Sequence, residues 1–101
     1  MKKMFISQPM NGLTDEEILE TRKNIQIRAE KEIGESVELI DSFITEDPDK
    51  NNNIPVWYLG KSILCLCKAD IAYFGGDWKS ARGCNIEHEI AVQYGVDRIE
   101  E

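Results

Sequence analysis

Apolar positions along the chain change spacing several times, and the changes predict strands that alternate with helices. Short apolar runs predict strands at residues 3–7, 36–42 and 69–76, and residues 96–101 form a last strand or a frayed end. The third run is apolar almost throughout, which is typical of a strand that is covered on both faces. A buried parallel sheet is the arrangement that best fits such a run.

Three helices are expected between these strands. The first begins at a capping box formed by Thr14 and Glu17, and Gly34 ends it. One face of this helix carries the apolar residues Ile18, Ile25, Ala29 and Ile33. A polar loop at 43–53 precedes a second helix at about 55–68, and the length of the loop suggests a functional or mobile segment.

Strand–helix alternation predicts a single α/β domain over residues 1–101. We expect a doubly wound, flavodoxin/Rossmann-like parallel sheet of four to five strands with helices on both faces. Ligands bind such sheets beyond the carboxyl ends of the strands. Three loops should therefore meet there: SQPMNG, DSFITED and GGDWKSARG.

The third helix, at 82–95, has one residue that breaks its apolar pattern. Its expected apolar stripe consists of Gly83, Ile86, Ile90 and Tyr94, with Ala91 at the border. Glu87 falls inside this stripe and would face inward at the ligand edge of the sheet. It is a candidate catalytic carboxylate; the alternative is a structural role, since the helix dipole favours acidic residues near a helix N-terminus.

Charge and composition exclude several classes of partner. Nineteen acidic against twelve basic residues give a net charge of −7. A nucleic acid would be repelled by this charge, and we find no basic cluster that would offset it. No apolar run approaches the roughly 20 residues that span a membrane, and the N-terminal stretch does not resemble a signal peptide. We therefore expect a cytoplasmic protein whose thiols, at Cys65, Cys67 and Cys84, are free.

The segment GCNIEHEIAVQYG resembles the signature of the nucleoside 2-deoxyribosyltransferase-like family. Gly83, Glu87, Ala91 and Gly95 occupy the signature positions. KADIAYF is similar to the family's third strand, with Asp70 at its start, and MFISQPM is similar to its opening strand and loop. Over most of the chain the resemblance is to a short branch that carries FISQPMNG-type and W…ARGC.IEH motifs.

The resemblance implies a function for Glu87. In characterised relatives the corresponding residue is the nucleophile on the anomeric carbon of a deoxyribosyl group, and a carboxylate suits an oxocarbenium-like centre. The implied partner is a small-molecule nucleoside or nucleotide. Relatives form dimers or higher oligomers whose subunits complete each other's pockets. We therefore expect a homo-oligomer, with an apolar patch formed by Trp57, Tyr58, Leu59 and Ile63.

One departure from the family pattern keeps two functions open. Many relatives carry a substrate-contacting aspartate eight residues before the third-strand aspartate, and here that position is Ser62. A serine does not supply a proton near neutral pH as a carboxylic acid does. Ser62 favours a non-catalytic binder of a nucleotide or a nucleotide-derived signal. Glu87 favours an enzyme that cleaves an N-glycosidic bond or transfers a deoxyribosyl group.

Polar residues of the loops are candidate ligand contacts. Ser80, Arg82 and Gly83 lie at a helix N-terminus, where a hydroxyl, a guanidinium and free amides are able to hold a phosphate. The alternative is a capping serine and a surface arginine. Ser7, Gln8 and Asn11 are candidate contacts to a ribose or base, and Gln8 alternatively only shapes the turn.

Four further residues complete the set of candidates. Trp78 either stacks on a base or covers its own loop. Asp41 is a candidate acid, because the end of the second strand points to the pocket. Cys84 and His88 stand at a spacing that is able to ligate zinc, but two ligands do not make a site. We therefore expect neither a metal nor a cofactor.

Overall fold

A computed structural model of the chain describes residues 1–42 and 44–101, and in these ranges strands and helices alternate. The strands are β1 (Lys2–Ser7), β2 (Val37–Leu39), β3 (Ile71–Phe74) and β4 (Asp97–Glu100). The helices are α1 (Asp15–Ile33), α2 (Ile54–Leu66) and α3 (Arg82–Gln93), with a short 3-10 helix η1 (Trp78–Ser80). All strand pairs are parallel, in the order β2-β1-β3-β4, which confirms the predicted α/β fold with a parallel sheet.

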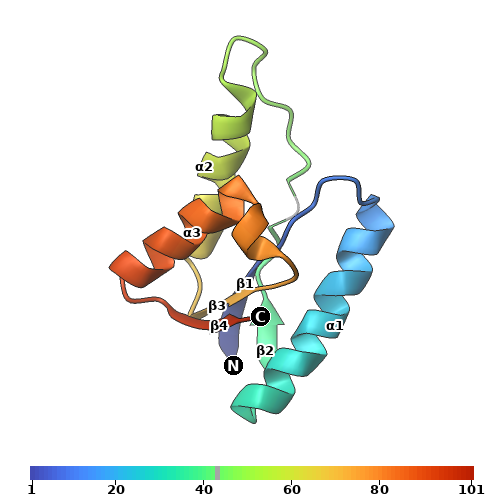
Figure 1. Cartoon of the computed structure of the whole chain (residues 1–101), viewed down its shortest axis with the longest axis vertical. Helices are drawn as coiled ribbons and strands as arrows, with labels where there is room; N and C mark the ends of the chain where they lie inside the picture. The colour runs from blue at the N-terminus through green and yellow to red at the C-terminus, as the bar shows by residue number, and fades with distance from the viewer. Residues whose placement is uncertain (43) are drawn as a thin grey trace.

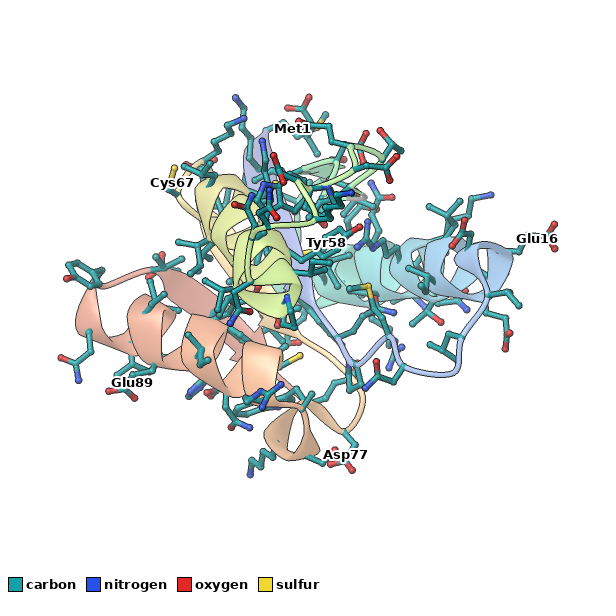
Figure 2. The ribbon with its side chains drawn as sticks, turned by 90° about the horizontal axis from the view of Figure 1, so that it is seen from above. Met1, Glu16, Tyr58, Cys67, Asp77 and Glu89 are labelled. Atoms are coloured by element: carbon teal, nitrogen blue, oxygen red, sulfur yellow. The ribbon has the colours of Figure 1, made fainter. Side chains whose placement is uncertain are left out.

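The helices lie on both sides of the strands. Figure 1 shows α1 on one side and α2 with α3 on the other, and the view from above in Figure 2 shows the same arrangement. Alternate residues of β1 and β3 point to opposite faces, so each face has its own core. The core under α1 contains Met4, Ile6, Ile25, Ala29, Val37, Ile71 and Tyr73. The core under α2 and α3 contains Phe5, Leu66, Ala72, Phe74, Trp78, Cys84 and Ala91.

Local signals fix the ends of α1 and the start of α2. The Thr14 side chain accepts from the Glu17 amide at 3.1 Å and the Glu17 side chain accepts from the Thr14 amide, as in the predicted capping box. Gly34 ends α1 in a left-handed conformation (φ 75°) that glycine adopts without strain. Asn53, which sequence patterns did not single out, caps α2 by accepting from the Val56 amide at 3.2 Å.

The second strand is shorter than the predicted 36–42. It pairs with β1 only at the start of β1. The last backbone hydrogen bond between the two segments runs from the Ile40 amide to the Met4 carbonyl at 2.9 Å. The chain then leaves the sheet edge, which brings Ser42 to the wall of a pocket. Of the predicted polar loop at 43–53, Phe43 lies outside the described residues, and 44–53 contain no helix or strand.

The buried face of α3 also differs from the predicted stripe. Its buried residues are Cys84, Glu87 and Ala91, whereas Ile86 is exposed and Tyr94, beyond the helix end, is 81% exposed. The inward position predicted for Glu87 is therefore observed, but its buried neighbours are smaller residues. Short side chains at 84 and 91 let α3 lie close to the sheet and to α2.

The strand order places β1 and β3 side by side at the centre of the sheet, and the chain leaves these two strands toward opposite edges. Such a reversal opens a crevice beyond the carboxyl ends of the two strands. Within the described residues, none of the helices combines the length and apolar character needed to cross a bilayer.

Candidate functional site

A pocket of about 630 Å³ is found where the crevice was expected. Its wall includes the end of β1 with the loop that follows it, part of α2, and the junction of η1 with α3. Residues 42 and 44 contribute from the segment after β2, so all three predicted loops reach the pocket. The volume lies within the range of small-molecule sites.

Most of the residues singled out in the sequence lie together in this wall. They are Ser7, Gln8, Asn11, Ser62, Ser80, Arg82, Gly83 and Glu87. These residues come from segments that are distant in the chain, and the carboxyl edge of the sheet brings them together.

Two of the predicted residues lie elsewhere. Trp78 is only 5% exposed and does not line the pocket; its indole donates to the Glu101 carbonyl at 3.2 Å, and its ring stacks on His88. It covers its own loop, as the alternative interpretation had it, and is not available to stack on a base. Asp41 is exposed and outside the pocket wall, and its carbonyl accepts from Cys65.

Glu87 is held in the pocket wall by residues of two other elements. Glu87 is only 6% exposed. The Ser7 hydroxyl, at the end of β1, donates to Oε1 at 2.6 Å, and the Ser62 hydroxyl of α2 donates to Oε2. Burial raises the pKa of Glu87, while the hydrogen bonds from Ser62 and Ser7 lower it in part. The carboxylate is thus fixed in direction and less acidic than usual.

Cys84 is the only thiol among the described residues of the wall. Burial raises the pKa of the Cys84 thiol; a hydrogen bond with Ser7 lowers it in part and the nearby charge of Glu87 raises it further. Cys84 therefore stays a protonated, weakly reactive thiol.

Among the described residues that line the pocket, Glu87 is the only one with a carboxyl group.

Arg22 lines the pocket from α1 and was missed by sequence reasoning. It is 8% exposed, and its Nε atom is buried with no hydrogen-bond partner among the described residues. Burial lowers its pKa, and the nearby charge of Asp41 opposes that change. A signal existed in the sequence: position 22 lies in the apolar stripe of α1, four residues after Ile18.

The N-terminus of α3 also opens onto the pocket. Ala81 provides no side-chain cap, and in the described first turn of α3 there is no acidic residue. The Ser80 hydroxyl donates to the Asp77 carbonyl at 2.8 Å, so Ser80 does not cap α3. The positive end of the helix dipole is therefore not balanced by a side chain at its N-terminus.

Cys84 and His88 do not share a site despite their spacing. Cys84 lines the pocket, whereas the His88 ring contacts Trp78 and Phe74 and pairs with Glu100. Across the part of the chain that the structure describes, no group of three or more His, Cys, Asp or Glu side chains is arranged to hold a metal ion.

Comparisons with protein-family models, with curated proteins and with solved structures find no match to this chain.

Proposed function

We propose that this protein cleaves the N-glycosidic bond of a nucleoside or nucleotide, or transfers its deoxyribosyl group, with Glu87 as the nucleophile. One observation carries the proposal. The only carboxyl group among the described lining residues is buried in the wall, and two serine hydroxyls fix its direction. A positioned carboxylate in a pocket of nucleotide size is what attack on an anomeric carbon requires.

The proposed reaction uses this geometry in two steps. A Glu87 oxygen forms a bond to the anomeric carbon, the C–N bond breaks, and its electron pair leaves with the base. The carboxylate stabilises the positive charge that develops on the sugar, and burial strengthens this interaction by excluding water. Water, or a second base, then attacks the same carbon and releases Glu87 as a carboxylate. Ser7 and Ser62 keep the carboxylate aligned in both steps.

The departing base must also receive a proton, and the pocket offers no second carboxyl group among its described residues. Ser62 stands where the resemblance places an acid, and its hydroxyl donates to Glu87. A base that is already positively charged, such as N7-methylguanine, leaves without being protonated. We therefore expect the fastest turnover with substrates of this kind.

The absence of a second carboxyl group in the described wall also favours one alternative, a binder that holds a nucleotide without turning it over. In that case Glu87 serves as an acceptor for hydrogen bonds from the ligand. The two functions differ in product formation, which chromatography detects directly.

The test is incubation with a panel of deoxynucleosides, deoxynucleotides and their N7-methylguanine forms, followed by chromatography of the released base. We expect Glu87→Gln to lower turnover by roughly three orders of magnitude or more, because the variant keeps the shape but loses the attacking charge. Glu89→Gln is the matched control: Glu89 is exposed on the same helix and points outward in Figure 2. Release of no base from any compound by the wild type would leave the binder as the function.

A further inference from the structure

A buried charge in the pocket is not used by the proposed reaction. Arg22 is more than nine-tenths buried, and its Nε–H group has no partner among the described residues. An unsatisfied donor of a charged group costs free energy in the folded protein, and burial lowers the pKa of this guanidinium accordingly. A ligand that accepts a hydrogen bond from this Nε–H group would remove that cost.

The charge of the pocket is opposite to that of the whole chain. The chain carries a net charge of −7. The charged side chains among the described lining residues are Arg22, Arg82 and Glu87, so two of the three are cations. The uncapped N-terminus of α3 adds a positive dipole end on the same wall.

We propose that Arg22 binds a phosphate group of the ligand, so that the pocket selects nucleoside monophosphates over the corresponding nucleosides. This inference deepens the proposed function and rests on it for the nucleoside part of the ligand. The anion itself is inferred from Arg22 and from the charges of the wall.

A phosphate suits the guanidinium of Arg22. The Nε–H group and a terminal N–H group of arginine donate in parallel to two oxygens of one oxyanion, an arrangement that lysine does not reproduce. The unpartnered Nε is one of these two donors. At about 630 Å³ the pocket has room for a sugar, a base and a phosphate together.

Arg22 has one competing role, which is to balance the charge of Asp41 within the fold. The charge of Asp41 raises the pKa of Arg22, so the two side chains interact electrostatically. If this is the main role of Arg22, its removal destabilises the protein and leaves ligand preference unchanged. If Arg22 instead binds the phosphate of a ligand, its removal abolishes the preference for monophosphates, and the melting temperature does not fall.

The experiment compares equilibrium binding of the four common deoxynucleosides, their 5′-monophosphates and inorganic phosphate by calorimetry. All proteins carry Glu87→Gln, so that turnover does not disturb the titrations. The variants added to this background are Arg22→Met, Arg22→Lys and the control Arg28→Met. Arg28 lies on the same helix, is 55% exposed in its side chain and is outside the pocket wall.

We expect the parent and Arg28→Met to bind at least one monophosphate about ten-fold or more tightly than its nucleoside. Arg22→Met should bind the monophosphate no more tightly than the nucleoside. Its melting temperature should be no lower than that of the parent. Arg22→Lys keeps the positive charge but lacks the two parallel N–H donors of arginine, so it should retain only part of the preference for the monophosphate. This variant tests the role of Arg22 even if Arg22→Met does not fold.

Several results would overturn the inference. They are equal affinity for nucleoside and monophosphate in the parent, binding of no phosphate compound at all, and an undiminished preference in either Arg22 variant. These outcomes are separate from those of the proposed reaction. Turnover of nucleosides without a phosphate preference removes only the role of Arg22, and a phosphate preference without turnover removes only the proposed reaction.

Discussion

Glu87 has an unusual protonation equilibrium because its carboxyl group is buried. A carboxyl group whose pKa is raised on folding, here from 4.5, holds its proton more tightly in the folded state. Its contribution to stability is therefore fully present below about pH 4.5 and is lost as the pH rises through the raised pKa. The proposed reaction needs the ionised form, so the same equilibrium places the acidic limit of activity above the usual pKa of a glutamate.

The stability of the wild type relative to Glu87→Gln should depend on pH in a defined direction. Since glutamine does not ionise, the difference in melting temperature should favour the wild type most at about pH 4 and shift toward the variant as the pH approaches neutrality. Thermal melts of both proteins across this range measure it. A difference that is independent of pH would mean that the Glu87 carboxyl titrates normally.

Ser62 tunes this equilibrium, because its hydrogen bond is the largest influence that lowers the pKa of Glu87. Ser62→Ala should move the acidic limb of the kcat/KM profile to higher pH and lower stability at neutral pH by about 1.5–3 kcal/mol. Ser80→Ala is the control, since the Ser80 hydroxyl also lies in the wall but bonds to the Asp77 carbonyl. Unchanged pH profiles in both variants would refute the role of Ser62.

At the scale of elements, α1 is the helix that the sequence specified most completely. The capping box at Thr14 and the glycine at 34 are local signals, and both ends of α1 follow from them. The end of β2 did not follow, because an edge strand stops where its single neighbour no longer pairs with it. The short helix η1 was also not expected, since its backbone bonds depend on how the loop packs between β3 and α3.

The capping box of α1 supports the helix that carries Arg22. Thr14→Ala removes the bond to the Glu17 amide and should cost about 1 kcal/mol, a fall of roughly 4–8 °C in melting temperature. Thr21→Ala is the matched control, because the Thr21 hydroxyl only bonds back to a carbonyl of its own helix. If the two variants melt alike, the cap contributes nothing to stability.

At the scale of the whole molecule, the sequence predicted the pocket better than its full chemistry. The parallel strand order and the convergence of the loops follow from strand–helix alternation. The inward position of Glu87 follows from its place on the buried face of α3. Arg22 obeys the same rule in α1 but was not recognised, since its long side chain is equally compatible with an exposed position. The covered position of Trp78 depends on contacts with His88 and Glu101, which no local pattern reveals.

We propose that the protein associates with a second copy through α2, next to the pocket. Several apolar residues of this helix are exposed, among them Val56 at 60% and Leu64 at 59%, whereas Trp57, Leu59 and Ile63 of the expected patch are half-buried within one chain. Light scattering at micromolar concentration should give at least a dimer, and Val56→Lys with Leu64→Lys should give a monomer. A monomeric wild type would contradict this proposal.

Attack of Glu87 on the sugar is tested most directly by trapping of the glycosyl-enzyme. The probe is the best substrate of the panel with fluorine at C2 of its sugar. The electron-withdrawing fluorine slows both formation and hydrolysis of the intermediate, and a good leaving group restores the rate of formation alone, so the intermediate accumulates. Intact-protein mass spectrometry should show one added glycosyl group on the wild type, mapped by peptide analysis to Glu87, and none on Glu87→Gln. Base released with no labelled protein, or a label on any other residue, would contradict the account.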